Sequence, residues 1–589
     1  MCIRDRTERV PNNTTNRVEI DLGTMYQYNN FDKNFISERV EQYRDQTARY
    51  LKGEISDEAF QQLRLRNGLY IQRLAPMLRI AVPYGAINSE QLRAIAEISR
   101  VYDKGYGHLS TRQNIQLNWP ELEEVPDILA DLAEVGMHAI QTSGSCVRNV
   151  TTDQFSGVSA DELVDGRPYC ELLRQWSTFH PEFEWLPRKF KIAINGAKND
   201  RAAIAVHDIG INAKLAKNGK PVLDVYVGGG LGRTPVIGSL IKEDLEEEHL
   251  LTYVEAILRV YNRYGRRDNK YKARIKILVR AMTAEAFKIK VDEEWHQLKD
   301  GPSKLTTNEI ERIKSFFVDP EYPLLENSKK LDAYAVTLLQ KELGEQRLGN
   351  RVFNTWVANN VAEHKRPGYA IVTLSTKPTG VPPGDVTDTQ MDKVAEWADK
   401  YGFGEIRISH DQNFVLPDIP QQHLYELFQE AEEFNLGQAN IGTLTDVICC
   451  PGGDYCSLAN AKSIPVAEEI QDRFDDYDFL HDLGPLDLNI SGCMNACGHH
   501  HVGHIGILGV DKKGSEFYQI SLGGNQGNGA SLGAIVGPSV SRHEVADVVE
   551  KVLDVFVDRR EGDETFLSVY RRIGIDPVSY THLTLPTKA

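Results

Sequence analysis

The strongest constraint on the fold is that the sequence resembles itself at one nearly fixed spacing. Three segments of the first half find a similar segment in the second half, in the same order, at offsets between 295 and 299 residues. The matched pairs are 110–117 with 409–416, 190–196 with 486–492, and 227–230 with 522–525. This order predicts two related halves around a pseudo-twofold axis. Because clefts between domains are common ligand sites, it also predicts a site between the halves.

The composition narrows the class of protein. A chain of 589 residues holds roughly three or four domains, and amphipathic helical patterns alternate with short β-rich runs, which predicts a mixed α and β fold. The net charge of -17 argues against a nucleic acid partner. There is no apolar run of about 18 residues and no secretory signal, so we expect no membrane contact and a cytoplasmic location.

Three segments read as lying outside the folded domains. Residues 1–6 and 578–589 carry no pattern continuous with their neighbours and resemble translated sequencing-adaptor sequence, so they are set aside. Residues 298–334 are rich in Gly, Pro and polar residues around one short helical run. We interpret this stretch as the linker between the halves.

Four cysteines carry the clearest chemical signal. Cys450 and Cys456 are spaced C-x5-C, and Cys493 and Cys497 are spaced C-x3-C. Four thiolates satisfy a [4Fe-4S] cluster, and the long first loop favours this over tetrahedral zinc, which stays open as the alternative. Cys449 is interpreted as a buried neighbour. Cys146 and Cys170 are interpreted as buried free thiols.

These motifs resemble a known family. C-x5-C with G-C-x-N-x-C-G, together with STRQN at 110–114 and LPRKFK at 186–191, is similar to the sulfite and nitrite reductases that carry coupled sirohaem and [4Fe-4S]. The similarity is to the sulfite reductase haemoprotein β-subunit type and runs from about Tyr26 to Pro577. It implies reduction of sulfite to sulfide in assimilation, with nitrite to ammonia as the alternative.

The resemblance also implies roles for individual residues. Cys450, Cys456, Cys493 and Cys497 would hold the cluster, and the Cys497 thiolate would also ligate the sirohaem iron. Cations would surround the substrate, and three further residues would contact sirohaem. The expected substrate residues are Arg79, Arg148, Lys189 and Lys191, and the expected sirohaem contacts are Arg112, Arg274 and Asn525. Asn118, His108 and Gln526 depart from the family pattern, so some sirohaem contacts are expected to differ.

The lysine pair decides the expected substrate. Strand alternation puts Lys189 and Lys191 on one face, where both ammonium groups can meet one anion. In the family, Lys-x-Lys at this strand goes with sulfite and Lys-x-Asn with nitrite. A dianion gains more from a second lysine than a monoanion does. Both features favour sulfite.

Other motifs add no further cofactor. The glycine runs at 228–232 and 523–529 lack the spacing of a dinucleotide loop, so electrons are expected from another protein, either a flavoprotein reductase subunit or a ferredoxin. The histidines between His499 and His504 are interpreted as packing residues. A non-catalytic iron-sulfur carrier is the rival function, but it would not need the four substrate cations.

The predicted fold class is α+β, with a pseudo-twofold repeat. A split ferredoxin-like domain combines a piece of each half, and two α/β domains enclose the cofactors. The expected ranges are 20–135 with 335–430 for the split domain, 136–297 for the first α/β domain, and 431–577 for the second.

Overall fold

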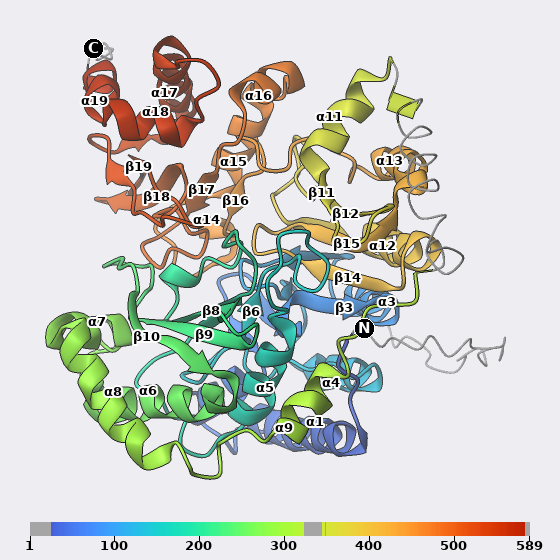
Figure 1. Cartoon of the computed structure of the whole chain (residues 1–589), viewed down its shortest axis with the longest axis vertical. Coiled ribbons are helices and arrows are strands. Elements are labelled where there is room, and N and C mark those ends of the chain that lie inside the picture. Colours follow the sequence, from blue (N-terminus) through green and yellow to red (C-terminus); the bar gives the residue numbers. More distant parts are fainter. Residues whose placement is uncertain (1–24, 323–343, 345, 348, 584–589) are drawn as a thin grey trace.

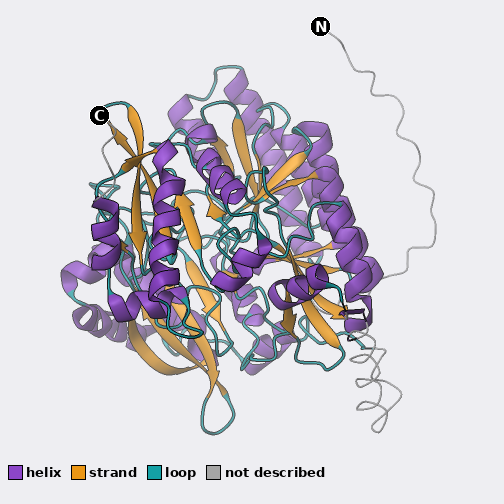
Figure 2. Cartoon of the chain, turned by 90° about the horizontal axis from the view of Figure 1, so that it is seen from above, coloured by secondary structure: helices purple, strands orange, loops and turns teal. Residues whose placement is uncertain are grey.

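The structure is a computed structural model and describes residues 25–322, 344, 346–347 and 349–583. Residues 1–6, part of the predicted linker, and 584–589 lie outside this range. The described chain mixes helices with four sheets, which confirms the predicted α+β class. Helices cover much of the outside, with strands running through the interior (Figure 2).

Two five-stranded antiparallel sheets combine both halves of the chain. Each takes its last strand from the opposite half: β13 (Asp385–Thr387) pairs with β4 (Tyr106–Leu109), and β3 (Ala86–Asn88) pairs with β14 (Glu405–Ile408). Figure 1 shows β3 beside β14. The other strands are β1 (Leu69–Ile71), β2 (Pro76–Ile80) and β5 (Ile115–Leu117) in one sheet, and β11 (Val361–Glu363), β12 (Tyr369–Leu374) and β15 (Phe414–Pro420) in the other.

The exchanged strands lead into helices with the same cap. Asn88 accepts a hydrogen bond from the backbone of Gln91 in α3 (Ser89–Tyr102), and Thr387 accepts one from Gln390 in α12 (Asp388–Tyr401). In both cases the glutamine side chain accepts from the N-cap backbone, which completes a capping box. The two helices pack against each other, so the sequence repeat is seen again in their caps.

Each half also forms a mixed sheet with one shared pattern. β6 (Thr151–Thr152), β7 (Ile192–Asn195) and β8 (Ile209–Leu215) run parallel, and β9 (Pro221–Val227) and β10 (Ser239–Glu246) continue antiparallel. The second half repeats these directions, and β21 (Val540–Ser541) is added beside its fourth strand. Its strands are β16 (Ile448–Cys449), β17 (Leu488–Ser491), β18 (Ile505–Lys512), β19 (Ser515–Leu522) and β20 (Ala534–Ile535).

The remaining helices pack around these sheets (Figure 1). Those of the first half are α1 (Asn30–Leu51), α2 (Asp57–Arg66), α4 (Val125–Glu134), α5 (Arg167–Ser177), α6 (Leu250–Tyr264), α7 (Ile275–Met282), α8 (Ala284–Leu298) and α9 (Thr307–Lys314). Those of the second half are α11 (Arg351–Asn360), α13 (Leu424–Glu433), α14 (Gly452–Tyr455), α15 (Ile464–Arg473), α16 (Tyr477–Leu483), α17 (Val545–Arg559), α18 (Phe566–Ile573) and α19 (Asp576–Leu583). Short 3-10 turns lie at Pro83–Gly85, Ile204–Val206, Glu247–His249, Gln421–His423 and Arg542–Glu544.

Matched loops tie the central sheets to the mixed sheets. Gln113 and Gln412 both adopt a left-handed backbone, with φ of 57° and 68°. The Gln113 side chain accepts from the Thr152 N–H at 3.1 Å, and the Gln412 side chain accepts from the Cys449 N–H at 2.9 Å. The same side-chain contact therefore aligns β6 in one half and β16 in the other.

The cores follow this division. One core combines residues from Val40 to Ala139 with residues from Phe353 to Ala439, and each mixed sheet has a core of its own. The first part of the predicted linker is not a free connection, because α9 and its neighbours from Leu305 to Phe317 pack into the core of the first mixed sheet. Its apolar positions face that core.

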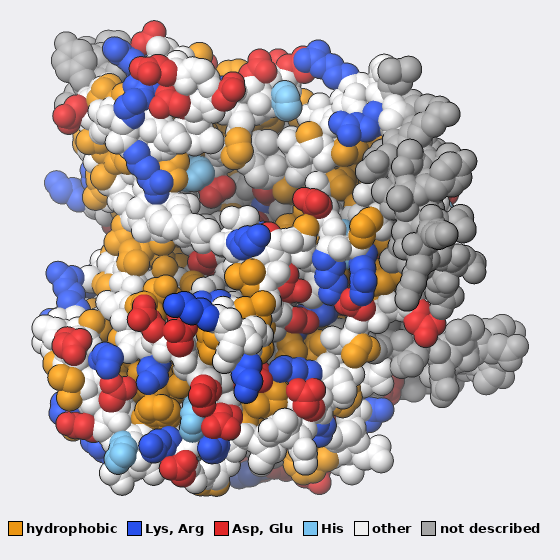
Figure 3. All heavy atoms as spheres, viewed as in Figure 1, with side chains coloured by type: hydrophobic (Ala, Val, Ile, Leu, Met, Phe, Trp, Pro, Cys, Tyr) orange, Lys and Arg blue, Asp and Glu red, His pale blue; other side chains and the backbone are white. Residues whose placement is uncertain are grey.

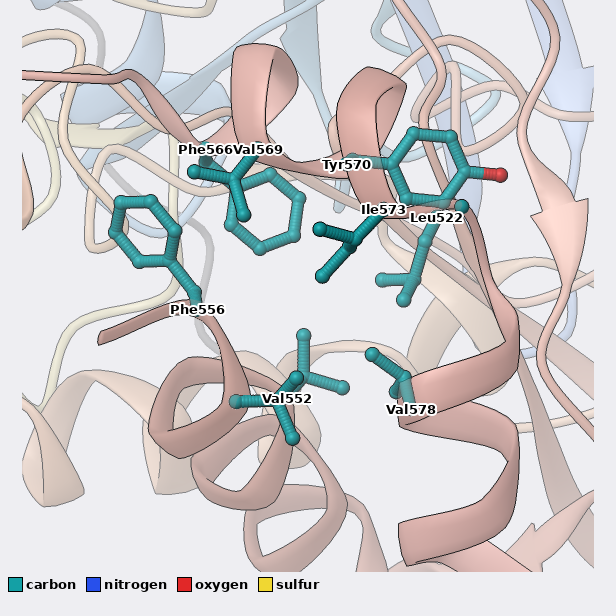
Figure 4. Close-up of a pocket in the computed structure, with 10 residues that line it drawn as sticks. Leu522, Val552, Phe556, Phe566, Val569, Tyr570, Ile573 and Val578 are labelled. Atoms are coloured by element: carbon teal, nitrogen blue, oxygen red, sulfur yellow. The ribbon is translucent and has the colours of Figure 1, made fainter. Parts of the chain in front are cut away.

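A small apolar pocket lies under the C-terminal helices (Figure 4). It is lined by β19, α17, α18 and α19, including Leu522, Phe556 and Val578. Val578 belongs to the segment predicted to be adaptor-like, yet its side chain is buried here. The lining offers almost no polar group, so this pocket is unsuited to a small anion.

The face of the molecule in Figure 3 shows how the charged side chains are distributed. Lys and Arg are interspersed with Asp and Glu over the face in Figure 3. Among the residues that the structure describes, no helix is long and apolar enough to cross a membrane.

Candidate functional site

The four predicted cysteine ligands lie on loops at the end of the second mixed sheet. Cys450 directly follows β16, Cys456 follows α14, and Cys493 and Cys497 lie in the loop after β17. These loops depend on glycine at close approaches. A Cβ on Gly452, which has φ of 56°, would lie 2.2 Å from the Ser463 Oγ, and a Cβ on Gly498 would lie 1.9 Å from the Ile490 carbonyl oxygen.

The thiols are electrostatic neighbours. Burial and Cys497 raise the pKa of Cys450 to about 12. Burial also raises the pKa values of Cys456 and Cys493, and the charge of Cys497 acts on both. The Gly492 N–H donates to the Cys450 sulfur at 3.2 Å. A set of thiols that holds its protons at neutral pH will release them when a metal binds.

The four cysteine sulfurs are not gathered as tightly as a single zinc ion would hold them. A tetrahedral zinc with bonds of about 2.3 Å would bring its sulfurs to about 3.8 Å from one another. Within residues 25–322 and 344–583 as described, the one trio of His, Cys, Asp or Glu whose ligand atoms lie within 4.8 Å is Glu246, Glu248 and His249. In that described part of the chain, no trio of the four cysteines is among such groups, and four thiolates are the ligand number that a cubane cluster requires.

Cys449 has a different environment. It is 1% exposed, belongs to the core of the second mixed sheet and pairs with Ile490 in β17. It is therefore placed as the buried neighbour that the sequence predicted. Cys170 is also buried, whereas Cys146 is half-buried and donates to the Ser143 carbonyl.

The two lysines lie on an extended segment just before β7. Phe190 between them is fully buried and its backbone accepts from the Arg148 N–H at 2.8 Å. The Phe190 side chain therefore packs inward, and Lys189 and Lys191 are half-buried on the other side. The hydrogen bond from Arg148 to Phe190 also places the Arg148 segment beside the segment of the two lysines.

Neither lysine ammonium has an acidic or carbonyl partner among the described residues, and the surroundings lower the pKa of both. Burial lowers the pKa of Lys189 to about 8, and burial with Lys189 and Arg112 lowers the pKa of Lys191 well below its usual value. A thiolate at Cys497 would raise the pKa of both lysines, in the opposite direction. Cys497 is exposed, and it is the cysteine whose thiolate would act on both the other three cysteines and the two lysines.

Arg79 and Arg148 converge on one carbonyl. Arg148 donates to the Thr142 oxygen at 2.6 Å and Arg79 donates to it at 3.4 Å. Arg79 is also held by the Gln116 side chain, to which its Nε donates at 2.8 Å. The guanidinium of Arg79 lies 5.3 Å from the centre of the Tyr70 ring. These contacts fix both arginines beside the lysine segment.

Tyr70 is a site residue that sequence reasoning missed. Burial would raise its pKa, but Arg148, Arg79 and Lys189 together bring the pKa below its usual value. The available signal was its place in a short apolar run just before the strand of Arg79. That signal is weak, because a tyrosine on a strand is usually a packing residue.

The side chains of Arg112 and Arg274, predicted to contact sirohaem, already make hydrogen bonds within the protein. Arg112 donates to the Thr151 hydroxyl at 3.0 Å and to the Asn149 carbonyl at 2.6 Å, and its buried Nε has no partner. Arg274 donates twice to Asp208, at 2.9 and 2.7 Å. His207, which contacts Arg112 at 2.6 Å, and Asp208 were also missed, because a His-Asp pair in the short connection before β8 is not a recognisable motif.

The Asn525 side chain makes no hydrogen bond to the arginines and lysines of the site among the described residues. Its side chain donates to the carbonyls of Asn528 and Gly529 at 2.7 and 3.3 Å and closes its own loop. That loop does reach the first half, because the Asn528 side chain donates to the Lys198 carbonyl at 2.9 Å. The structure thus brings together the cations and Cys497 but uses the Asn525 amide locally.

The donor set fits an iron-sulfur cluster next to an anionic group. Four soft thiol ligands are present, and the neighbouring lysines lack hydrogen-bond partners within the described chain. A buried Arg112 Nε also has no partner. Groups of this kind need negative charge close by.

Comparisons with known proteins agree with this geometry. Residues 143–299 and 441–576 match the Nitrite and sulphite reductase 4Fe-4S domain, and residues 72–135 and 377–434 match the Nitrite/Sulfite reductase ferredoxin-like half domain. Each half therefore contains one part of both domain types.

Individual proteins show the same similarity over most of the chain. "Sulfite reductase [ferredoxin] 1" of Mycolicibacterium paratuberculosis is 25% identical over 84% of this chain and 81% of its own length. "Assimilatory ferredoxin-dependent nitrite reductase" of Haloferax mediterranei is 27% identical over 85% and 83%. The solved structure of the Mycobacterium tuberculosis NirA protein shares the fold, with a TM-score of 0.72, 24% identity, and coverage of 89% of this chain and 92% of that chain.

Proposed function

The chain belongs to the nitrite and sulphite reductase family, and from this premise we propose that it reduces sulfite to sulfide in assimilation. The observation that carries the proposal is the position of Cys497. Its thiol is exposed, and as a thiolate, the form that binds metal, it would raise the pKa values of three other cysteines and of Lys189 and Lys191. One sulfur thus links a metal-binding set to an anion-binding set.

The proposed cofactors are a [4Fe-4S] cluster and sirohaem. Cys450, Cys456, Cys493 and Cys497 would hold the cluster, and Cys497 would also hold the sirohaem through its iron. Arg112 and Arg274 lie close enough to Lys191 to contribute to the positive surroundings that the acidic side chains of sirohaem require. The bound cofactors supply electrons in sequence and an open iron for the substrate.

The chain's own cations bind and orient the substrate. Arg79 and Arg148 are fixed by carbonyl and amide contacts, so they are preorganised to bind an oxyanion. The side-chain nitrogens of Lys189 and Lys191 have no hydrogen-bond partner among the described residues, so they can move to contact the anion. Sulfite reduction consumes six electrons and seven protons and yields HS⁻ and three waters. Lys189, with a pKa near 8, is suited to giving up and regaining protons near neutral pH.

We propose a ferredoxin-type iron-sulfur protein as the electron donor. The relatives that cover most of the chain have ferredoxin in their names, which supports this choice over a flavoprotein reductase subunit. Reduced ferredoxin should therefore sustain turnover without an added reductase.

The alternative substrate is nitrite, which would be reduced to ammonia. Relatives of both kinds have similar identity, from 25 to 28%, so identity does not separate them. Lys191 supports sulfite, because a second ammonium group stabilises a dianion more than a monoanion.

The testing experiment is steady-state reduction of both anions by purified holoenzyme with reduced methyl viologen as donor. The absorption spectrum is recorded first. Sirohaem bands with a higher kcat/KM for sulfite support the proposal, and the same bands with nitrite preferred overturn the substrate. A protein expressed with iron and sirohaem supply that is colourless and inactive refutes the proposed cofactors.

A further inference from the structure

Asp208 is a fully buried carboxylate directly before β8, and it forms an ion pair with Arg274. Its Oδ2 accepts from the Lys191 backbone N–H at 2.8 Å. Its Oδ1 accepts from Arg274 Nε at 2.9 Å and from Arg274 Nη2 at 2.7 Å. One side chain therefore joins the segment of Lys191 to the N-terminal end of α7.

These bonds hold the backbone of Lys191 on both sides. The Lys191 N–H donates to Asp208, and the Lys191 carbonyl accepts from the Ile209 N–H at 3.2 Å. The Asp208 carbonyl in turn accepts from the Gly228 N–H at 3.1 Å. Since the Lys191 ammonium has no hydrogen-bond partner within the described residues, its position is set by this backbone clamp.

The second half contains the same clamp with a different acceptor. The Asp487 N–H donates to His504 Nδ1 at 3.1 Å, the Asp487 carbonyl accepts from the Ile505 N–H at 3.0 Å, and the His504 carbonyl accepts from the Gly523 N–H at 3.0 Å. The three bonds match those around Asp208 one for one. The clamp is thus a property of the repeated fold, whereas its charge differs between the halves.

The accepting side chain is a carboxylate in the first half and an imidazole in the second half. Asp208 accepts from the Lys191 backbone and from the Arg274 side chain, whereas His504 Nδ1 accepts from the Asp487 backbone as a ring nitrogen without a proton. A histidine would suffice for the backbone bond, as the second half demonstrates. The carboxylate in the first half therefore serves a further purpose, which is to hold Arg274 and to offset part of the positive charge.

We propose that Asp208 is a positioning residue for the reaction. It sets where Lys191 and Arg274 stand relative to the bound anion, and it limits the positive charge of the group. This inference rests on the proposed function for its effect on turnover. The hydrogen bonds that hold the Lys191 backbone do not depend on the reaction that the protein catalyses.

The main test is Asp208→Asn in the holoenzyme. The amide keeps the size of the side chain but cannot accept from both Lys191 and Arg274. Because a displacement of about 1 Å can cost roughly a hundredfold in rate, kcat per bound sirohaem should fall by about tenfold to a hundredfold. KM for sulfite should stay the same or fall, since the site becomes more positive. A residue with only a structural role would instead lower the yield of loaded enzyme and leave kcat per sirohaem unchanged.

A second readout does not depend on turnover. Hydrogen–deuterium exchange, resolved to the Lys191 amide, should quicken by at least about tenfold in Asp208→Asn. Unchanged exchange at Lys191, or unchanged kcat per sirohaem, overturns the proposal. If wild-type holoenzyme reduces neither sulfite nor nitrite, the proposed function fails, while the exchange result still decides the clamp.

Two further variants complete the design. His504→Leu breaks the matching clamp and should quicken exchange at Asp487 while kcat stays within about twofold of wild type. If Asp208→Asn does not fold, Asp208→Glu keeps the charge and moves the carboxylate by one methylene. It should still lower kcat per sirohaem and quicken exchange at Lys191, and wild-type values of either in this variant overturn the proposal.

Discussion

Replacing Lys191 by asparagine should change the preference between the two anions. Two unit charges about 5 Å apart interact by about 3 kcal/mol at an effective dielectric constant of about 20. Sulfite as a dianion carries one more charge than nitrite, so this is an upper value for the difference that Lys191 makes.

The surroundings of Lys191 reduce that value. Burial, Lys189 and Arg112 hold its pKa well below the usual range, so part of the attraction to an anion is spent on protonating the amine. We therefore expect Lys191→Asn to lower kcat/KM for sulfite more than for nitrite by about 1 to 2 kcal/mol, a factor of about 5 to 30.

The assay measures kcat/KM for both anions at pH 8 with reduced methyl viologen and normalises it to sirohaem content. Lys217→Asn, a change at an exposed lysine near the β8–β9 turn, is the matched control and should leave the ratio unchanged. Equal losses for the two anions, or a larger loss for nitrite, would refute the Coulombic reasoning.

Three more outcomes follow from the site. Cys497→Ser should disturb the cluster EPR signal and the sirohaem absorption together, and wild-type spectra from both would remove its double role. Cys449→Ala should keep the full iron content but lower the free energy of unfolding by about 1 kcal/mol, seen as a lower Tm; loss of iron would instead make Cys449 a ligand. Because the pKa of Lys189 is depressed to about 8 in the folded chain, the unfolded chain binds the extra proton between about pH 8 and 10.4, so stability gains from this residue as pH rises through that window. The Tm of cofactor-free wild type should therefore rise relative to Lys189→Met from pH 8 to 10, and a constant difference would contradict the depressed pKa.

The sequence predicted those features that depend on local spacing or on the repeat. Cys450 and Cys497 could be found from their spacing, and the matched mixed sheets follow from the offset between the halves. The placement of Lys189 and Lys191 around a buried Phe190 follows from strand alternation. In each case the pattern spans only a few neighbouring residues or occurs in both halves of the chain.

Features that depend on long-range contacts could not be predicted in this way. Gln116 holds Arg79 across paired strands, and Asp208 reaches Arg274 over 66 residues of sequence. Neither residue belongs to a motif, and their partners become visible only once the sheets are assembled. Asn525 differs, because its amide bonds within its own loop, and the sequence does not show that this local turn occupies the side chain.

The exchange of β3 and β13 has a consequence for how the chain is made. Until Asp385–Thr387 has left the ribosome, the first-half sheet ends at β4 with an unpaired edge, and β3 has no sheet to join. The two central sheets can close only late in synthesis, and such distant pairings slow folding. Expression of either half alone should therefore give an aggregation-prone product, and co-expressed halves should be soluble only as a complex. Neither central sheet can therefore be completed before the other half of the chain is available, and both are completed when the two halves come together.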